Sequence, residues 1–302
     1  MNAITPPSVS VPSVAAPQAA AHAEHPAREA LRMFLRNPSA IAGMAMLLIV
    51  LLVAIAGPWI WPADPFEIRT MPLSPPFSEE AWLGSDQLGR DVLTGIIHGG
   101  RATLMVGAFA ALLSVCIGVT LGAMAGYYGG RVDALLMRVT EFFQVLPALL
   151  FAMVVVTLFS PSLVTVTLAI GSVSWPATAR LTRAEFMRIR QLEFVRAESA
   201  IGARHGRIIW KVILPNALPP LVVSATLAVG AAILFEASLS FLGLGDPNRM
   251  SWGLMIGSSR SYMLSSWWAV TFPGLMIFLT VLAVSLIGDG LNDALNPKLR
   301  ER

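Results

Sequence analysis

The chain has 302 residues; 13% of them are charged, 55% are hydrophobic, and the formal net charge is +3. The charged share is about half that of an ordinary soluble domain, which argues strongly against a soluble globular enzyme and excludes a disordered chain. The mean hydropathy of +0.68 indicates a membrane protein instead. The single cysteine, Cys116, excludes an intrachain disulfide and a cysteine metal cluster.

The N-terminal segment, residues 1–39, is expected to be a disordered cytoplasmic tail. Its composition up to Ala27 is dominated by Ala, Pro, Ser and Val without any period. A signal peptide is not expected, because the apolar run that follows begins too late and is too long for one. That run should therefore remain in the protein as a membrane anchor.

Five long uncharged runs follow, and a membrane-spanning helix needs about 20 apolar residues. The runs contain 27, 29, 38, 24 and 28 residues, at positions 37–63, 102–130, 142–179, 212–235 and 261–288. The 38-residue run is too long for one helix and is interrupted by the turn signal Ser160-Pro161-Ser162. Six spans are therefore predicted, near residues 40–61, 102–126, 140–159, 163–180, 217–241 and 268–288.

The distribution of charge between the spans predicts their orientation. Residues 180–211 carry eight basic and three acidic side chains, whereas residues 62–101 carry six acidic and three basic ones. Because basic loops stay on the cytoplasmic side, the loop at 181–216 is expected to be cytoplasmic and the segment 62–101 external. With six spans, both termini then lie in the cytoplasm, including a C-terminal tail at 291–302.

The second span carries a stripe of small residues, Gly118, Gly122 and Gly126, on one helix face. Such a stripe lets another helix approach closely. Packing within the chain is the favoured interpretation, and a dimer face is the alternative.

Glu236 is the one ionisable residue that lies well inside a predicted span. A carboxylate at that depth is costly, which makes it a candidate for lining or gating a transport path. The alternative is a structural hydrogen bond near the external end of the span.

Three charged residues of the external segment, Asp86, Arg90 and Asp91, are candidates for an external gate or for contact with a partner. The local alternative is that Ser85 or Asp86 caps a helix while Arg90 pairs nearby.

The cytoplasmic loop is predicted to contain a short amphipathic helix ended by Gly202. Its apolar side chains are Phe194, Val195, Ala197, Ala200 and Ile201. Arg196 and Glu198 could fix its register at the rim of a partner's groove. The alternative is a surface helix that rests on lipid headgroups.

This loop resembles the signature loop of permease subunits in binding-protein-dependent ATP-binding-cassette importers. Ala197, Gly202 and Leu214-Pro215 fall on the pattern E-A-A-x3-G-x9-I-x-L-P, and the departures from it are Arg196, Glu198 and Val212. Further segments are similar to the dipeptide/oligopeptide/nickel permease group, and most of all to its second, dipeptide-type subunit. These segments are residues 83–93, 98–101, 239–245, 267–268, 272–274 and 288–298.

The resemblance implies an all-α membrane protein with an N-terminal anchor helix outside a five-helix permease core at 102–290. It implies a bacterial inner-membrane location, contact with membrane lipid, a second homologous permease subunit, two cytoplasmic ATPases and an external solute-binding protein that delivers a di- or oligopeptide. The ATPase-coupling residues would be Phe194, Arg196, Ala197, Glu198, Ala200, Gly202, Leu214 and Pro215.

The chain itself is then expected to be no enzyme and to need no cofactor, metal or nucleic acid, because ATP hydrolysis belongs to the partner ATPases. Three alternatives stay open. One is an importer subunit of the same family for nickel or another small solute. The others are a secondary carrier that works alone and a membrane anchor or receptor.

Overall fold

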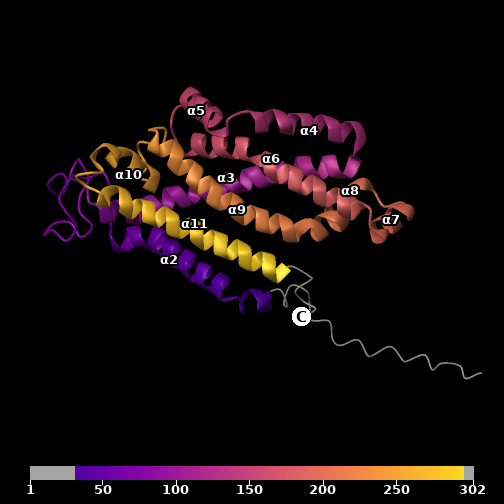
Figure 1. Cartoon of the computed structure of the whole chain (residues 1–302), viewed down its shortest axis with the longest axis horizontal. Helices are drawn as coiled ribbons and strands as arrows, with labels where there is room; N and C mark the ends of the chain where they lie inside the picture. The colour runs from indigo at the N-terminus through magenta and orange to yellow at the C-terminus, as the bar shows by residue number, and fades with distance from the viewer. Residues whose placement is uncertain (1–30, 296–302) are drawn as a thin grey trace, which may run out of the picture.

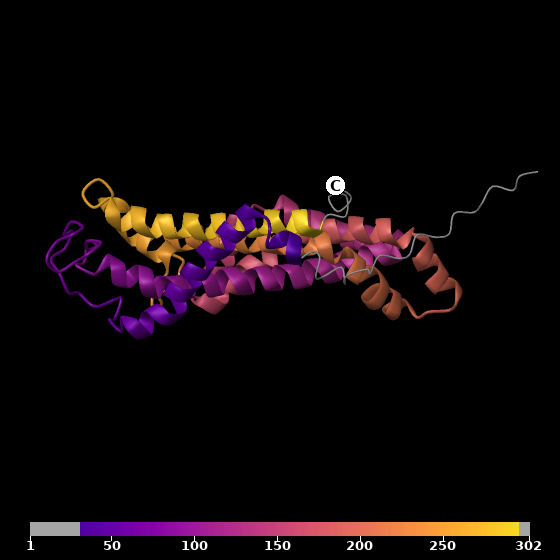
Figure 2. The same ribbon diagram turned by 90° about the horizontal axis from the view of Figure 1, so that it is seen from below.

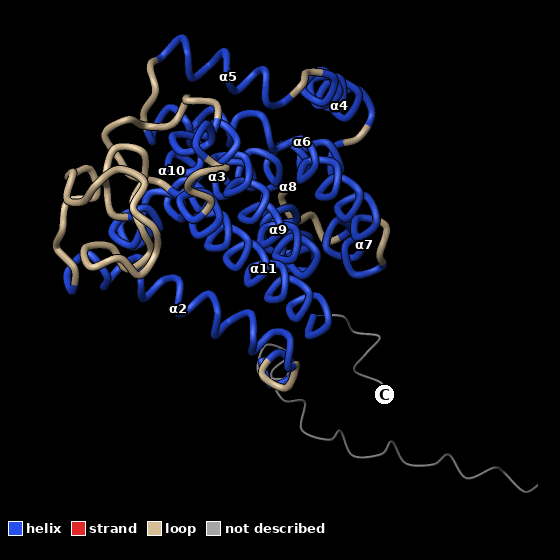
Figure 3. Tube along the Cα trace, turned by 60° about the vertical axis from the view of Figure 1, so that its left-hand side comes forward, coloured by secondary structure: helices blue, strands red, loops and turns tan. Residues whose placement is uncertain are grey.

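The computed structural model describes residues 31–295, and most of that range is helical (Figures 1 and 3). The helices are α2 (Pro38–Ile60), α3 (Val92–Tyr128), α4 (Gly130–Val145), α5 (Ala148–Phe159), α6 (Leu163–Arg190), α7 (Glu193–Ala200), α8 (His205–Arg207), the π-helix η1 (Ile208–Ile213), α9 (Leu214–Phe241), α10 (Trp252–Ser259), the 3-10 helix η2 (Arg260–Tyr262) and α11 (Trp268–Leu295). The predicted N-terminal tail lies largely outside the described residues, as does the end of the predicted C-terminal tail.

The long helices run side by side in an elongated bundle with two different ends (Figures 1 and 2). One end, called the α10 end below, consists of the irregular segment 61–91 together with α10 and η2. The other, called the α7 end, consists of α7, α8 and η1. The all-helical membrane fold expected from the sequence is confirmed, and α2 packs along the outer side of α11 (Figure 1).

Within residues 31–295, four continuous helical segments are long and apolar enough to cross a membrane: residues 38–60, 92–128, 205–241 and 268–295. A fifth crossing results if α4 and α5 are counted together as one bent span. The predicted span at 163–180 coincides with the first part of α6. That helix does not meet the same criterion, because it carries Pro176, Arg180 and several Ser and Thr residues. The count of six spans is therefore not confirmed.

The expected helix at 140–159 is divided in two by a bend of 85° between α4 and α5. Pro147 lacks the backbone N–H that an uninterrupted helix needs, and the residue before it, Leu146, has the extended conformation (φ −68°, ψ 129°) that a following proline favours. The break predicted at Ser160-Pro161-Ser162 is present, and the side chain of Ser162 accepts a hydrogen bond from the N–H of Thr165 (3.1 Å) at the start of α6.

The glycine stripe of α3 packs against α6, as intramolecular packing predicts. A Cβ atom at Gly118 would lie 2.7 Å from the Cβ of Thr178, and one at Gly126 would lie 2.7 Å from the carbonyl oxygen of Arg183. The two helices are therefore close enough that only glycine fits at these positions. Cys116 lies on the opposite, exposed side of α3.

Three indole groups connect the α10 end to the bundle. Each N–H donates a hydrogen bond: Trp61 to Thr94 Oγ1 (2.9 Å), Trp252 to the carbonyl of Ile96 (3.0 Å), and Trp268 to the carbonyl of Ser85 (3.0 Å). The helix α3 also begins at Val92, well before the predicted start of its span at residue 102. The irregular segment between α2 and α3 is correspondingly shorter than expected.

Candidate functional site

The helix α7 ends in a Schellman motif built on Gly202. The N–H of Ala203 donates to the carbonyl of Glu198 (3.1 Å), and the N–H of Gly202 donates to the carbonyl of Ser199 (3.1 Å). Gly202 has a φ of +82°, a conformation in which a side chain is strained. The glycine therefore ends the helix and sets the direction of the chain toward α8.

The two faces of α7 have different surroundings. Val195 is 3% exposed and packs with Phe186, Ile189 and Ile208 of α6 and η1. Phe194 is 43% exposed, and Ile201, directly after the helix, is 80% exposed. The prediction that Val195 belongs with the apolar side chains that would contact a partner is therefore wrong, because this side chain anchors α7 to the bundle instead.

The other apolar residues of this segment, Phe194, Ala197, Ala200 and Ile201, are all exposed and together form the free face of α7. Ala197 and Ala200 are both exposed, so the backbone of α7 is open to close approach on this side. Glu198 forms an ion pair with Arg207 (3.8 Å), whereas Arg196 forms no ion pair with a described residue. The face is thus a small apolar surface with charged side chains at its edge.

The chain after α7 is one long helical segment from residue 205 to residue 241. Its η1 part is a π-helix, in which the N–H of Leu214 bonds to the carbonyl of Ile209. Pro215 follows directly, and the wider turn relieves the clash between its ring and the preceding carbonyls. Leu214 is half-buried and Pro215 exposed, so both lie at the junction between η1 and α9 rather than on α7.

Asp86 and Asp91 at the α10 end have local structural partners. Asp91 is the N-cap of α3 and accepts hydrogen bonds from the N–H and the hydroxyl of Thr94 (3.0 and 2.5 Å). Asp86 accepts from the backbone N–H groups of Leu88 and Arg90 (2.8 and 2.9 Å) and closes a turn. The helix cap expected at Ser85 or Asp86 is instead at Asp91, five residues after Asp86.

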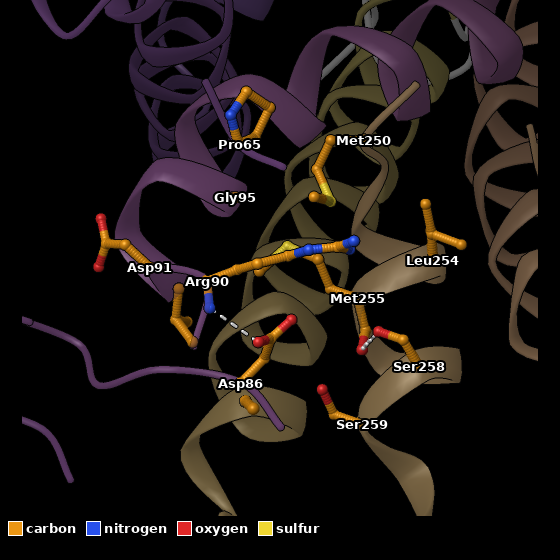
Figure 4. Close-up of a pocket in the computed structure, with 12 residues that line it drawn as sticks. Pro65, Asp86, Arg90, Asp91, Gly95, Met250, Leu254, Met255, Ser258 and Ser259 are labelled. Atoms are coloured by element: carbon orange, nitrogen blue, oxygen red, sulfur yellow. Dashed lines mark hydrogen bonds between the residues drawn. The ribbon is translucent and has the colours of Figure 1, made fainter. Parts of the chain in front are cut away.

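Arg90 extends from this turn across a small cavity toward Met250 and Met255 (Figure 4). The cavity measures about 20 Å³, enough for a single water molecule. The guanidinium carbon of Arg90 lies 5.1 Å from the ring centre of Phe66. The buried Nε of Arg90 has no hydrogen-bond partner among the described residues. The expected nearby ion pair of Arg90 is not formed within the described part of the chain.

Glu236 is buried, with 1% of its surface exposed, where α9 meets the start of α10. Its Oε1 accepts hydrogen bonds from the hydroxyls of Ser240 (2.7 Å) and Ser251 (2.9 Å), whereas its Oε2 has no partner among the described residues. Ser251 also caps α10 through the N–H of Leu254 (3.1 Å). The carboxylate therefore connects α9 to α10.

The candidate residues form two groups at opposite ends of the bundle (Figure 1). The residues around α7 are at one end, and the charged residues with Glu236 are toward the other. Sequence reasoning missed Ser240 and Ser251 as partners of Glu236. The i, i+4 spacing of Glu236 and Ser240 could have indicated the first of these, but only the fold brings Ser251 to the same place.

Comparisons with known proteins give a consistent result. Residues 118–301 match the family described as "binding-protein-dependent transport system inner membrane component", and residues 25–76 match the "N-terminal TM domain of oligopeptide transport permease C". The chain is 40% identical to a di/tripeptide transport system permease protein of Pseudomonas aeruginosa, over 99% of both chains. It is 42% identical to a dipeptide transport system permease protein of Haemophilus influenzae, over 91% of this chain and 96% of the other.

Two further similarities extend this comparison. A glutathione transport system permease protein of Pectobacterium atrosepticum is 38% identical, over 91% of this chain and 92% of the other. A solved structure of the methionine ABC transporter MetNI in an inward-facing conformation matches with a TM-score of 0.57 and 19% identity, over 67% of this chain and 96% of the other. At that identity, the structural match supports the fold alone.

Proposed function

Because the chain belongs to the family of binding-protein-dependent transport system inner membrane components, we propose that it is one of two permease subunits of an ATP-driven importer of short peptides. The curated relatives named for dipeptides, di- and tripeptides and glutathione support this class of substrate. A second, homologous permease subunit completes the path, and an external solute-binding protein delivers the peptide.

The free face of α7 carries the mechanistic part of the proposal. Two cytoplasmic ATPases hydrolyse ATP, so their motion must reach the membrane through a contact with the permease. Phe194, Ala197 and Ala200 of α7, with Ile201 directly after it, are left exposed by residues 31–295 at one tip of the bundle, as expected of a helix that docks into a groove. Because Val195 packs α7 against Ile208 of η1, and the segment from 205 to 241 is continuous, movement of α7 would be passed through η1 to α9.

The orientation is supported by charge. The α7 end includes the basic segment 180–211, and the α10 end includes the acidic segment 62–101. We therefore place the α7 end in the cytoplasm of a bacterial cell and the α10 end outside the inner membrane. Asn37, just before α2, donates a hydrogen bond to Asp293, near the end of α11 (3.1 Å). Both ends of the described chain therefore lie on the same side of the membrane in this orientation.

Labelling with an impermeant thiol reagent tests this orientation. In a Cys116→Ala background, a cysteine placed at Ser78 in the external segment should react in intact cells. A cysteine placed at Ile201, which is 80% exposed, should react only after the membrane is opened. The reverse pattern would overturn the proposed orientation.

Purification of the complex tests the function. Two ATPase chains and a second permease should co-purify with this chain, and the reconstituted complex should take up peptide only with ATP and binding protein. Uptake by this chain alone, driven by an ion gradient, would instead identify a secondary carrier.

A further inference from the structure

A cavity of about 610 Å³ opens behind α7, on the side opposite its free face. Its walls are the end of α3, the end of α6, α7 itself and the start of the segment that follows. This volume lies within the range of ordinary ligand sites, roughly 300–1,000 Å³. The polar groups that line it include Tyr127, Arg190, Arg196, Ser199 and His205, and none of its lining residues is Asp or Glu.

The arginines of the cavity differ from their neighbours in the same part of the chain. Arg183, Arg188 and Arg207 each form an ion pair, with Asp133, Glu185 and Glu198 respectively. Arg190 and Arg196 form no ion pair with a residue in the range 31–295. The cavity therefore holds positive charge that the described chain does not neutralise.

The walls of the cavity hold Arg190 in place. Its guanidinium carbon lies 5.7 Å from the ring centre of Tyr127, a cation–π arrangement. The hydroxyl of Tyr127 is in turn hydrogen-bonded to Nδ1 of His205 (2.7 Å). The side chain of Arg190 is thus oriented by α3 and α8, although no acid balances its charge.

Aromatic residues indicate the depth of the cavity in the membrane. Tyr128 is the last residue of α3 and Trp210 belongs to η1, and each side chain is about half exposed. Tyr and Trp gather where lipid headgroups begin, because their rings are apolar and their polar atoms reach water. The cavity is therefore at the level of the headgroups.

We infer that this cavity binds the phosphate group of an anionic lipid headgroup. Guanidinium groups bind phosphate oxygens through paired hydrogen bonds, and the hydroxyl of Ser199 is a further donor in the cavity wall. Arg190 is the last residue of α6 and Arg196 belongs to α7, so one bound phosphate would bridge the bundle and the docking helix. The cavity lies on the side of α7 away from Phe194, Ala197 and Ile201, and Arg196 stands at the edge shared with the proposed ATPase contact. The inference rests on the proposed function only for the side of the membrane.

Lipid retention by the purified transporter tests the inference. The complete complex would be stripped of lipid in detergent and titrated with phosphatidylglycerol or with zwitterionic phosphatidylcholine, and the bound lipid counted by native mass spectrometry. Phosphatidylglycerol should bind the wild type in preference to phosphatidylcholine. Arg190→Gln should weaken this binding about fivefold, the effect of one basic side chain at the headgroup level.

Two matched variants control for general effects. Arg188→Gln removes the same charge two residues earlier in α6, from a side chain that is paired with Glu185 and does not line the cavity, and should leave lipid affinity unchanged. Arg190→Lys keeps the charge without the paired hydrogen bonds and should restore part of the affinity.

Three results would overturn the inference. The first is equal retention of phosphatidylglycerol by the wild type and Arg190→Gln. The second is binding of free inorganic phosphate as tightly as the lipid, which would identify a soluble anion as the ligand. The third is release of the ATPases from Arg190→Gln with unchanged lipid binding, which would assign the cavity to the ATPase contact; the proposed function would survive that result.

Discussion

The two ends of the bundle differ in how their short helices and buried polar groups are held by the rest of the chain. At the α10 end, indole N–H groups donate hydrogen bonds to other parts of the same chain, and the buried carboxylate of Glu236 accepts hydrogen bonds from Ser240 and Ser251. At the α7 end, a helix anchored by the single buried side chain of Val195 leaves its other apolar side chains exposed. The α10 end is held by contacts within the chain, whereas one face of α7 is left exposed by the described residues.

This difference separates residues that stabilise the fold of the chain from residues that would contact a partner. A substitution in the internally bonded region should act first on stability, because it leaves buried groups without partners. A substitution on the free face of α7 should act first on association, because that face contributes little to the fold of the chain alone. Substitutions in the two regions test this separation.

The largest effect is expected at Gly202. In Gly202→Val a β-branched side chain must adopt a φ of +82°, which is strongly disfavoured, so the end of α7 should reorganise. The variant should insert and pair with the second permease, but it should lose most of its ATPase subunits on purification.

Gly206→Val is the matched control. Gly206 lies in α8, where an added Cβ meets nothing within 4 Å and φ is not positive. This variant should keep its ATPases. If Gly202→Val retained its ATPases but inserted poorly, α7 would be a helix that rests on lipid.

Phe194 and Val195 are adjacent residues of α7 with opposite predicted effects. Phe194→Asp should weaken ATPase association by about tenfold or more with little change in melting temperature, because the side chain is exposed. Val195→Ala should lower the melting temperature through a loss of roughly 1–2 kcal/mol, because the side chain is buried. Pull-down and thermal unfolding of both variants measure the two effects, and a loss of stability in Phe194→Asp would contradict the separation.

Arg90 joins the irregular external segment to α10, so its removal should loosen the surface that a binding protein would contact. Arg90→Ala should lower the stimulation of ATPase activity by the binding protein roughly several-fold while expression stays normal. Arg69→Ala, which removes a partly exposed arginine paired with Glu67, is the control and should have no effect. Unchanged stimulation in Arg90→Ala would leave this residue with a structural role alone.

The smallest effect is expected from Glu236→Gln. The amide oxygen still accepts from Ser240 and Ser251, so uptake should stay within about twofold of the wild type. Glu236→Ala removes the acceptor from both hydroxyls and should cost about 1–3 kcal/mol of stability. A large loss of uptake in Glu236→Gln at normal stability would show that the charge itself serves transport.

Local signals in the sequence predict much of this architecture. The turn at Ser160-Pro161-Ser162, the close packing at the glycine stripe and the end of α7 at Gly202 depend on nearby residues, and the structure contains all three. Features that depend on the tertiary fold were not predictable in the same way. Val195 is buried by residues of α6 and η1. Glu236 accepts a hydrogen bond from Ser251, which belongs to a separate loop.

The bend at Pro147 is intermediate between these cases. The proline itself is visible in the sequence, and a kink there is expected on local grounds. Its angle of 85° depends on how the surrounding helices pack. The sequence alone therefore could not distinguish two helices, α4 and α5, from one tilted span.

Cross-linking from Ile201 tests the central claim most directly. In a Cys116→Ala background, a cysteine at Ile201 would carry a photoactivatable cross-linker, and the products formed in native membranes would be identified by mass spectrometry. The exposed position next to α7 predicts a product with the ATPase subunit, whereas the same cross-linker at Ser78 should give none. Products with lipid alone from Ile201, in a complex that retains its ATPases, would contradict the proposal that α7 is the docking helix.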